Sequence, residues 1–156
     1  MQNGWTVHAD DGAWFEDGPD RGRILASGRD TGGRYSLMEW IVAAGETPAP
    51  DAPRTYGPHR HREIEETFYV KSGSLEFLLG DEVTTLNAGD FVRVPPGVRH
   101  GYANVSGAPV ALLVSFHPGG FEELFVKYRT DQEPAVDGDG FIADATRLFA
   151  SEFEAL

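Results

Sequence analysis

Hydrophobic residues in the middle of the chain occur in short runs that turn-forming residues separate. The run at 34–42, RYSLMEWIV, is rich in β-branched and aromatic residues and follows Gly32-Gly33. Further runs of four to seven residues follow, so we predict strands at 66–70, 75–79, 82–86, 91–94, 98–103 and 110–116. Many short strands with frequent turns are typical of a β-sandwich or β-barrel rather than of alternating strands and helices.

The hydrophobic pattern changes towards the C-terminus. Apolar residues recur at helical spacing over 121–128, and residues 145–153 approximately repeat that spacing. We therefore predict two short helices, joined by an acidic loop over 131–140, that pack on an all-β core. No linker divides the chain, which predicts one domain with an N-terminal arm at 1–29, a barrel at about 30–118 and a C-terminal helical segment at about 119–156.

Composition and charge narrow the chemistry. The 156 residues include 13 basic and 25 acidic ones, and the formal charge of −12 argues against nucleic acids and anionic membranes as partners. The absence of cysteine excludes disulfides, thiolate metal sites and thiol catalysis. Neither a signal-peptide pattern at Met1–Asp11 nor an apolar run of membrane-spanning length is present, so we expect a soluble, cytoplasmic protein.

Several histidines and one glutamate stand where predicted strands would bring them together. His59 and His61 are two residues apart, so on an extended segment both side chains point to the same face. On the next strand Glu66 shares a face with the apolar Phe68. Burying that carboxylate without a positive charge would be costly. A divalent cation held by these two histidines, Glu66 and a third histidine would supply the charge, and His100 is the obvious third.

Two motifs around these residues resemble those of the cupin superfamily. Residues 59–73 read His-x-His-x4-Glu-x6-Gly, which is similar to the later part of the first cupin motif. Residues 89–104 read Gly-x5-Pro-x-Gly-x2-His-x3-Asn and match the second motif at every defined position. The glycine expected before the first histidine is not at its usual distance, where Gly57-Pro58 stands instead. The shape of that loop is therefore expected to differ from the family pattern.

The resemblance implies a jelly-roll β-barrel with one divalent metal ion per chain, bound by His59, His61, Glu66 and His100. It also implies a homodimer, often with exchanged N-terminal strands. Iron (Fe), manganese (Mn), nickel (Ni) or cobalt (Co) is preferred, because a six-coordinate ion keeps two positions open. Four protein ligands would instead close a tetrahedral zinc (Zn) site. A degenerate cupin, in which the four residues form a hydrogen-bonded cluster without metal, is the alternative.

The predicted barrel interior is apolar and suits an aromatic or polyketide-like ligand. It would be lined by Phe68, Phe77, Phe91, Tyr102 and Phe116. Asn104 would lie beside the metal ligands and support them. His8 and His117 lack a partner pattern and are expected to take no part. Residues 137–140 resemble a calcium loop only superficially, and we interpret them as a turn with a helix N-cap.

The whole pattern looks most similar to single-domain, quercetin dioxygenase-like cupins. We therefore expect a non-haem dioxygenase or other oxygenase that acts, with O₂, on a small enolisable or aromatic molecule such as a flavonol. In it Glu66, on dissociating from the metal, would serve as general base towards a substrate hydroxyl. One alternative is a zinc-dependent cyclase or isomerase, in which the metal acts only as a Lewis acid. Another is a cupin that binds a small molecule without catalysis.

Overall fold

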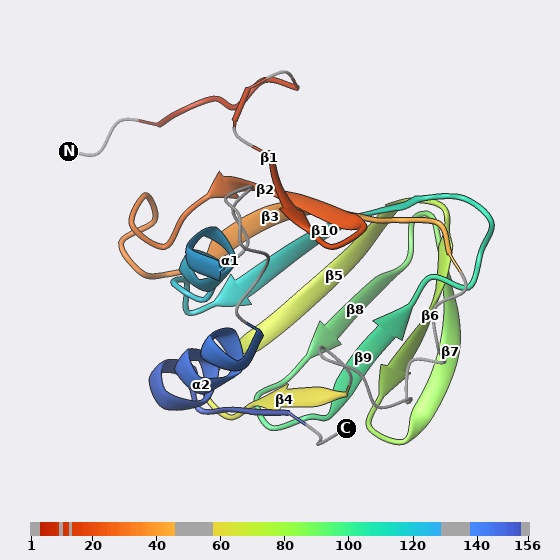
Figure 1. The fold of residues 1–156 in the computed structure, drawn as a ribbon. Helices are drawn as coiled ribbons and strands as arrows, with labels where there is room; N and C mark the ends of the chain where they lie inside the picture. The colour runs from red at the N-terminus through yellow and green to blue at the C-terminus, as the bar shows by residue number, and fades with distance from the viewer. Residues whose placement is uncertain (1–3, 10, 13, 46–57, 129–137, 154–156) are drawn as a thin grey trace.

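The computed structural model describes residues 4–9, 11–12, 14–45, 58–128 and 138–153, which form eleven strands and two helices (Figure 1). The strands are β1 (Trp14–Asp17), β2 (Asp20–Ala26), β3 (Ser36–Val42), β4 (His59–His61), β5 (Glu65–Ser72), β6 (Ser74–Leu79), β7 (Glu82–Asn87), β8 (Phe91–Val94), β9 (His100–Ala103), β10 (Val110–His117) and β11 (Ser151–Phe153). The helices are α1 (Glu122–Tyr128) and α2 (Gly138–Phe149). None of the described helices is long and apolar enough to cross a membrane.

The strands form two antiparallel sheets that face each other. The first has the order β1-β2-β3-β10-β5-β8 and the second the order β11-β4-β9-β6-β7. Chain neighbours such as β4 and β5 lie in different sheets, so the chain crosses repeatedly between the two (Figure 1). This arrangement confirms the predicted all-β jelly-roll barrel with short C-terminal helices.

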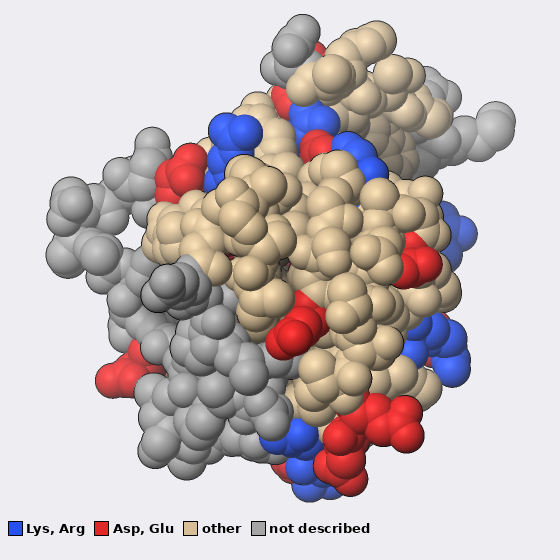
Figure 2. All heavy atoms as spheres, turned by 90° about the vertical axis from the view of Figure 1, so that its right-hand side faces the viewer, with Lys and Arg blue, Asp and Glu red and all other residues tan. Residues whose placement is uncertain are grey.

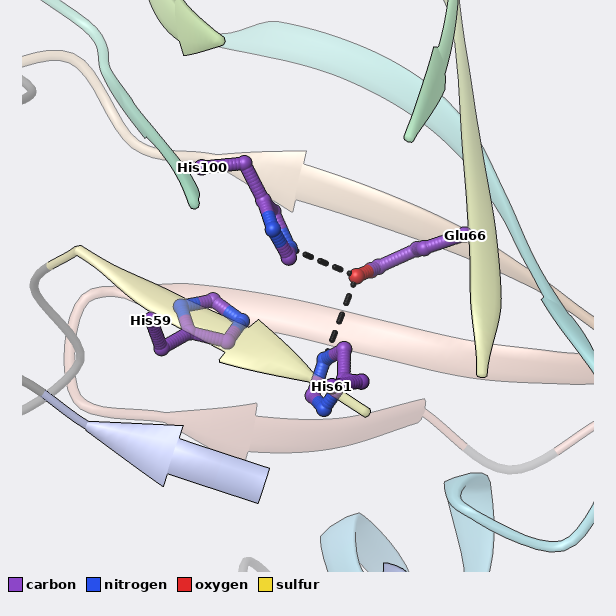
Figure 3. Close-up of side chains that lie close together, drawn as sticks. All are labelled: His59, His61, Glu66 and His100. Atoms are coloured by element: carbon purple, nitrogen blue, oxygen red, sulfur yellow. Dashed lines mark hydrogen bonds and ion pairs between the residues drawn. The ribbon is translucent and has the colours of Figure 1, made fainter. Parts of the chain in front are cut away.

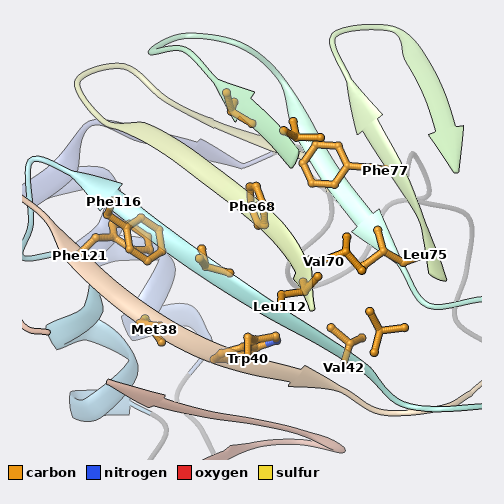
Figure 4. Close-up of a cluster of buried hydrophobic side chains, with 14 of the residues drawn as sticks. Met38, Trp40, Val42, Phe68, Val70, Leu75, Phe77, Leu112, Phe116 and Phe121 are labelled. Atoms are coloured by element: carbon orange, nitrogen blue, oxygen red, sulfur yellow. The ribbon is translucent and has the colours of Figure 1, made fainter. Parts of the chain in front are cut away.

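Alternating side chains of the strands fill the space between the sheets. On β3, Met38, Trp40 and Val42 are buried, and on β5 Phe68 and Val70 meet them from the same sheet (Figure 4). The residues between them on β5 belong to the outer face, where Tyr69 is exposed. Each fully buried apolar side chain contributes about 1.5–3 kcal/mol, so this alternation fixes which face of each strand points inward.

The first two strands lie in the segment predicted as an arm. Their signal is weak because β2 carries charged residues and a glycine, two of which make specific contacts with β3. Arg23 forms a buried ion pair with Glu39 of β3, with Nη2 and Oε2 2.7 Å apart. A Cβ on Gly22 would lie 2.5 Å from the ring of Trp40, so only glycine leaves room for that indole. Residues 14–26 therefore extend the first sheet.

The C-terminal segment differs from the prediction beyond its second helix. The first helix lies where it is expected, whereas Phe153 is in strand β11 and not in a helix. Helix α2 ends at Phe149 because the next residue, Ala150, adopts a left-handed conformation with φ 48°, which redirects the chain. The strand then pairs antiparallel with β4. Of the predicted acidic loop, residues 131–137 lie outside the described residues, and Gly138–Gly140 begin α2.

Candidate metal centre

The structure brings the four predicted metal ligands together between the two sheets. His59 and His61 come from β4 and His100 from β9, all in the second sheet, while Glu66 comes from β5 in the first (Figure 3). One ligand atom of each residue lies within 4.8 Å of the corresponding atoms of the other three. All are buried except His59, which is partly exposed. The cluster therefore draws its residues from both sheets.

Strand geometry explains why these side chains converge. His59 pairs directly with His100 across β4 and β9, so their rings lie side by side with centroids 4.3 Å apart. His61 is two residues further along the strand and points to the same face. Glu66 is on the inward face of β5 together with Phe68, as the alternation predicts. The convergence of these side chains thus follows from the two-residue alternation along each strand.

The hydrogen bonds of His100 place an imidazole lone pair against a carboxylate. His100 Nδ1 lies 3.0 Å from the carbonyl oxygen of Val98, which only accepts, so Nδ1 carries the proton. In the neutral ring Nε2 is then an acceptor, and it lies 2.9 Å from Oε2 of Glu66. Two acceptors at this distance repel each other unless a proton or a metal cation lies between them.

The Nε2 atom of His61 also faces Glu66. Its Nδ1 lies 2.7 Å from the hydroxyl of Ser151. Its buried Nε2 is 3.4 Å from Glu66 Oε2 and has no hydrogen-bond partner among the described residues. Three imidazole nitrogens and one carboxylate oxygen are a common donor set for divalent iron, manganese, cobalt, nickel or zinc. The residues therefore fit a divalent ion.

The charge state of Glu66 agrees with this reading. Burial by itself raises the pKa of Glu66, but a proton shared with His100 and His61, which gives these rings a positive charge and hydrogen bonds to the carboxylate, outweighs it and holds the pKa below the ordinary value. The side chain is therefore a carboxylate at neutral pH. It supplies the negative charge that a cation between these residues requires.

A cavity of about 570 Å³ adjoins the cluster, and His59, His61 and Glu66 form part of its wall. This volume lies within the usual range of small-molecule sites. Most of the remaining wall is apolar and aromatic, with Trp40, Phe68, Tyr102, Phe116, Phe121 and Phe125 contributing. The cavity thus offers a polar, metal-competent region beside an aromatic surface.

Two acidic residues on the turn between β1 and β2 also line the cavity. Asp17 and Asp20 were not singled out in the sequence, because a single sequence gives no sign that this turn reaches the barrel interior. Burial and the nearby negative charge of Asp20 raise the pKa of Asp17 to about 7. Asp20 Oδ1 accepts a hydrogen bond from the backbone N–H of Ala43 at 2.8 Å. A carboxyl that is partly protonated near neutral pH therefore lies in the cavity wall.

The predicted pocket residues are divided between the cavity, the core and the surface. Phe68, Tyr102 and Phe116 line the cavity. Phe77 is buried and packs against Phe68 with ring centroids 5.0 Å apart. The prediction for Phe91 is wrong, because its side chain is 60% exposed. On the edge strand β8 the neighbouring residues, Val92 and Val94, point inward instead.

Asn104 is fully buried just after β9. Its Nδ2 donates to the carbonyl oxygens of Ala43 and Ala108, each 2.9 Å away, and its Oδ1 accepts from Ser106. These bonds fasten the end of β3 to the turn before β10. A supporting role beside the metal ligands stays a prediction. His117 bonds to Ser115 Oγ through Nε2 at 2.9 Å and is not part of the cluster.

The C-terminal strand β11 contributes to the centre without having been predicted. Ser151 contacts His61, and the ring of Phe153 stacks on that of His59 with centroids 5.4 Å apart. The sequence contains no signal for either contact, since a serine and a phenylalanine about 50 residues beyond the second motif match no metal-site spacing. Only the reversal at Ala150 brings them there.

Comparison with known proteins identifies the region that carries these motifs. A family model described as "Cupin domain" matches residues 39–116. An uncharacterized protein of Methanocaldococcus jannaschii is 28% identical over 87 residues, which are 56% of this chain and 63% of that protein. An uncharacterized protein of Aquifex aeolicus is 41% identical over 61 residues, or 39% of this chain and 50% of that protein. The chain thus spans less than two thirds of either relative.

Solved structures share the fold over most of the chain. The polyketide cyclase RemF from Streptomyces resistomycificus is 26% identical, with a TM-score of 0.59 over 74% of this chain and 80% of that one. KdgF from Halomonas sp. is 18% identical, with a TM-score of 0.63 over 78% and 99%. A predicted oxalate decarboxylase from Thermotoga maritima is 15% identical, with a TM-score of 0.64 over 73% and 99%. The last two likenesses concern the fold alone.

Proposed function

The chain belongs to the cupin family, and on this basis we propose that it is a metal-dependent enzyme for a small, enolisable or aromatic organic molecule. One observation carries the proposal. The histidine nitrogens and the carboxylate of Glu66 converge with facing lone pairs, beside an aromatic cavity of about 570 Å³. Such a cluster is costly in an apolar interior unless it holds a cation.

The four residues His59, His61, Glu66 and His100 would hold the ion, which as a Lewis acid would polarise an oxygen atom of the substrate. The aromatic wall would pack on the substrate ring and exclude water from the reacting atoms. Glu66 is the residue that we propose as the general base. Its carboxylate lines the cavity and is ionised at neutral pH, so it can accept a proton from a substrate hydroxyl.

A reaction without oxygen, such as cyclisation or isomerisation, has the stronger support. The polyketide cyclase RemF, at 26% identity, is similar to this chain beyond the level of fold alone. The wall of the cavity includes Phe, Tyr and Trp side chains, which suit flat, partly aromatic molecules. We therefore propose a non-redox reaction on a polyketide-like substrate.

A dioxygenase reaction is the second candidate. The donor set of three histidines and one glutamate suits iron, manganese, nickel or cobalt, and four protein ligands leave two of six positions open. Those positions would accommodate an enolic substrate together with O₂. The motif pattern is also similar to that of quercetin dioxygenase-like cupins.

One experiment separates these candidates. The purified protein would be analysed for bound metal and then incubated with 1,3-dicarbonyl, flavonol and polyketide-like compounds, with and without oxygen. Turnover that persists under strict anaerobiosis supports the cyclase or isomerase, and oxygen uptake matched to substrate loss supports the dioxygenase. His100→Ala is expected to lose both metal and turnover. A protein that binds no divalent metal would contradict the proposal as a whole.

A homodimer in the cytoplasm is the assembly and location that we propose for this enzyme. The side of the barrel that carries β6 and β7 presents mostly uncharged residues (Figure 2). Val83 on β7 and Leu79 on β6 are exposed hydrophobic residues. Light scattering of the purified chain tests the dimer directly, and a monomer at micromolar concentration would contradict it.

A further inference from the structure

The short strand β11 lies directly beside the strand that carries two of the proposed metal ligands. It lies alongside β4 (Figures 1 and 3). The two strands pair antiparallel, with Ser151 opposite His61 and Phe153 opposite His59. Opposite residues of an antiparallel pair place their side chains on the same face. Both side chains of β11 that face the centre therefore meet a histidine.

Ser151 determines how the ring of His61 is held. The hydroxyl and Nδ1 are 2.7 Å apart, and neither side chain is exposed to solvent to any useful extent, with 0% exposure for Ser151 and 2% for His61. When the ring donates its Nδ1 proton to the hydroxyl, the lone pair of Nε2 is left facing Glu66. A hydrogen bond of this kind fixes both the tautomer and the orientation of a metal-binding histidine.

Phe153 holds the second histidine by packing. Its ring is nearly parallel to that of His59, with an interplanar angle of 16° and centroids 5.4 Å apart. His59 is the most exposed of the four clustered residues, so it depends most on a neighbour to limit its rotation. Two of the three histidines are thus restrained by one strand of three residues.

We infer that β11 is a positioning element of the metal centre, and that metal binding and docking of this strand are thermodynamically linked. The inference rests on the proposed function, because it assumes that the cluster holds a divalent ion. The strand lies beyond residues 39–116, which the family model matches. Ser151 and Phe153 would touch the histidines rather than the metal, and would therefore act through them. Since linkage is reciprocal, metal should also stabilise the docked strand.

Glu152 provides a matched control on the same strand. It lies between the two positioning residues, and its carboxylate pairs with Arg60 on β4 and with Arg62 just after that strand, both on the exposed side. Exposed ion pairs contribute little to stability. Glu152→Gln therefore tests whether weakening the strand's surface contacts is enough to alter the centre.

The test uses Co²⁺, whose visible absorption reports the geometry of its ligands, with the full chain and a competing chelator. Ser151→Ala is expected to weaken Co²⁺ binding by about 10- to 100-fold and to change the absorption spectrum. Ser151→Thr, which keeps a hydroxyl, should restore the wild-type spectrum and affinity. Glu152→Gln should match the wild type in both.

Hydrogen exchange of the wild-type protein provides a second measurement that needs no variant. Exchange at residues 151–153 should slow when Co²⁺ is added, as linkage requires. An unchanged Co²⁺ affinity and spectrum in Ser151→Ala would overturn the inference. So would a rate of hydrogen exchange in β11 that does not change when the metal is added. If the wild-type protein itself binds no Co²⁺, Zn²⁺ or Fe²⁺, the proposed metal centre fails instead, so the two failures are distinguishable.

Discussion

Asp17 is a half-buried carboxyl in the wall of the cavity, and its raised pKa connects the cavity to the stability of the fold. Burial, and then the charge of Asp20, raise its pKa to about 7 from 3.8. Between these values the folded protein holds a proton that the unfolded chain releases. The free energy of unfolding therefore falls as the pH rises through this range. Above pH 7 the folded state carries an unfavourable buried charge.

Removing the carboxyl of Asp17 should remove this pH dependence of the free energy of unfolding. Asp17→Asn is expected to show a flatter stability profile between pH 4 and 7. At pH 8 the free energy of unfolding of this variant should exceed that of the wild type by about 1–3 kcal/mol. Urea unfolding at several pH values measures this difference. Glu16→Gln, an exposed change on the same strand, is the control and should keep the wild-type profile. A profile for Asp17→Asn that parallels the wild type would contradict the prediction.

At the level of single residues, the sequence predicts the cluster better than its surroundings. His59, His61 and Glu66 follow from the two-residue period of strands, and His100 from the second motif. Asp17 and Ser151 reach the same region through contacts between segments that are far apart in the chain. Neither local pattern nor spacing encodes such contacts, which depend on how turns and helices direct the chain.

The strands also divide into those that the local sequence pattern predicts and those that depend on contacts between distant segments. Strands with regular alternation, such as β5 and β10, lie where the sequence predicts them. By contrast, β2 carries buried Arg23 and Gly22, whose partners on β3 compensate for their weak strand preference. Tertiary contacts thus override local preference at β2, and the backbone reversal at Ala150 does so at β11.

Helix α1 is attached to the barrel by a buried carboxylate. Glu122, in its first turn, is 0% exposed and accepts hydrogen bonds from the backbone N–H groups of Gly28 at 2.6 Å and Gly120 at 2.7 Å. These bonds join the loop after β2 to the start of the helix. Since Phe121 and Phe125 line the cavity, the position of α1 also shapes the proposed substrate site.

Removal of this carboxylate should destabilise the whole domain. Glu122→Ala leaves two backbone donors without their acceptor, so we expect a loss of about 2–4 kcal/mol in the free energy of unfolding. Glu123→Ala is the matched control, because its neighbouring carboxylate forms only an exposed ion pair with Arg29. Equilibrium urea unfolding of the two variants compares them. Equal losses would show that Glu122 has no special role.

At the scale of the whole molecule, the candidate metal centre draws its residues from both sheets. The three histidines belong to the second sheet and Glu66 to the first. The net charge of −12 is a separate feature, because residues 122–156 hold nine acidic and three basic residues and none of these charged residues belongs to the cluster. Among the clustered residues only Glu66 is acidic. An ion held there would link the sheets, so its binding should stabilise the fold.

Removing the metal should therefore lower the Tm of the wild-type protein, and restoring it should raise the Tm again. With free metal at about one hundred times its Kd, the gain is about 2.7 kcal/mol. Glu66→Gln should abolish this gain. Its amide N–H₂ can donate to the facing imidazole nitrogens, so this variant should stay folded without metal and be at least as stable as the metal-free wild type.

Glu65→Gln is the control for this comparison, because Glu65 is adjacent but pairs with Arg93 on the outer face. It should keep the full response to metal. Differential scanning calorimetry with chelator and with added Zn²⁺ or Co²⁺ measures all three proteins. A Tm of the wild type that does not respond to metal would show that the two sheets are held without an ion. Protonation alone would then relieve the repulsion between the facing lone pairs of His61, His100 and Glu66.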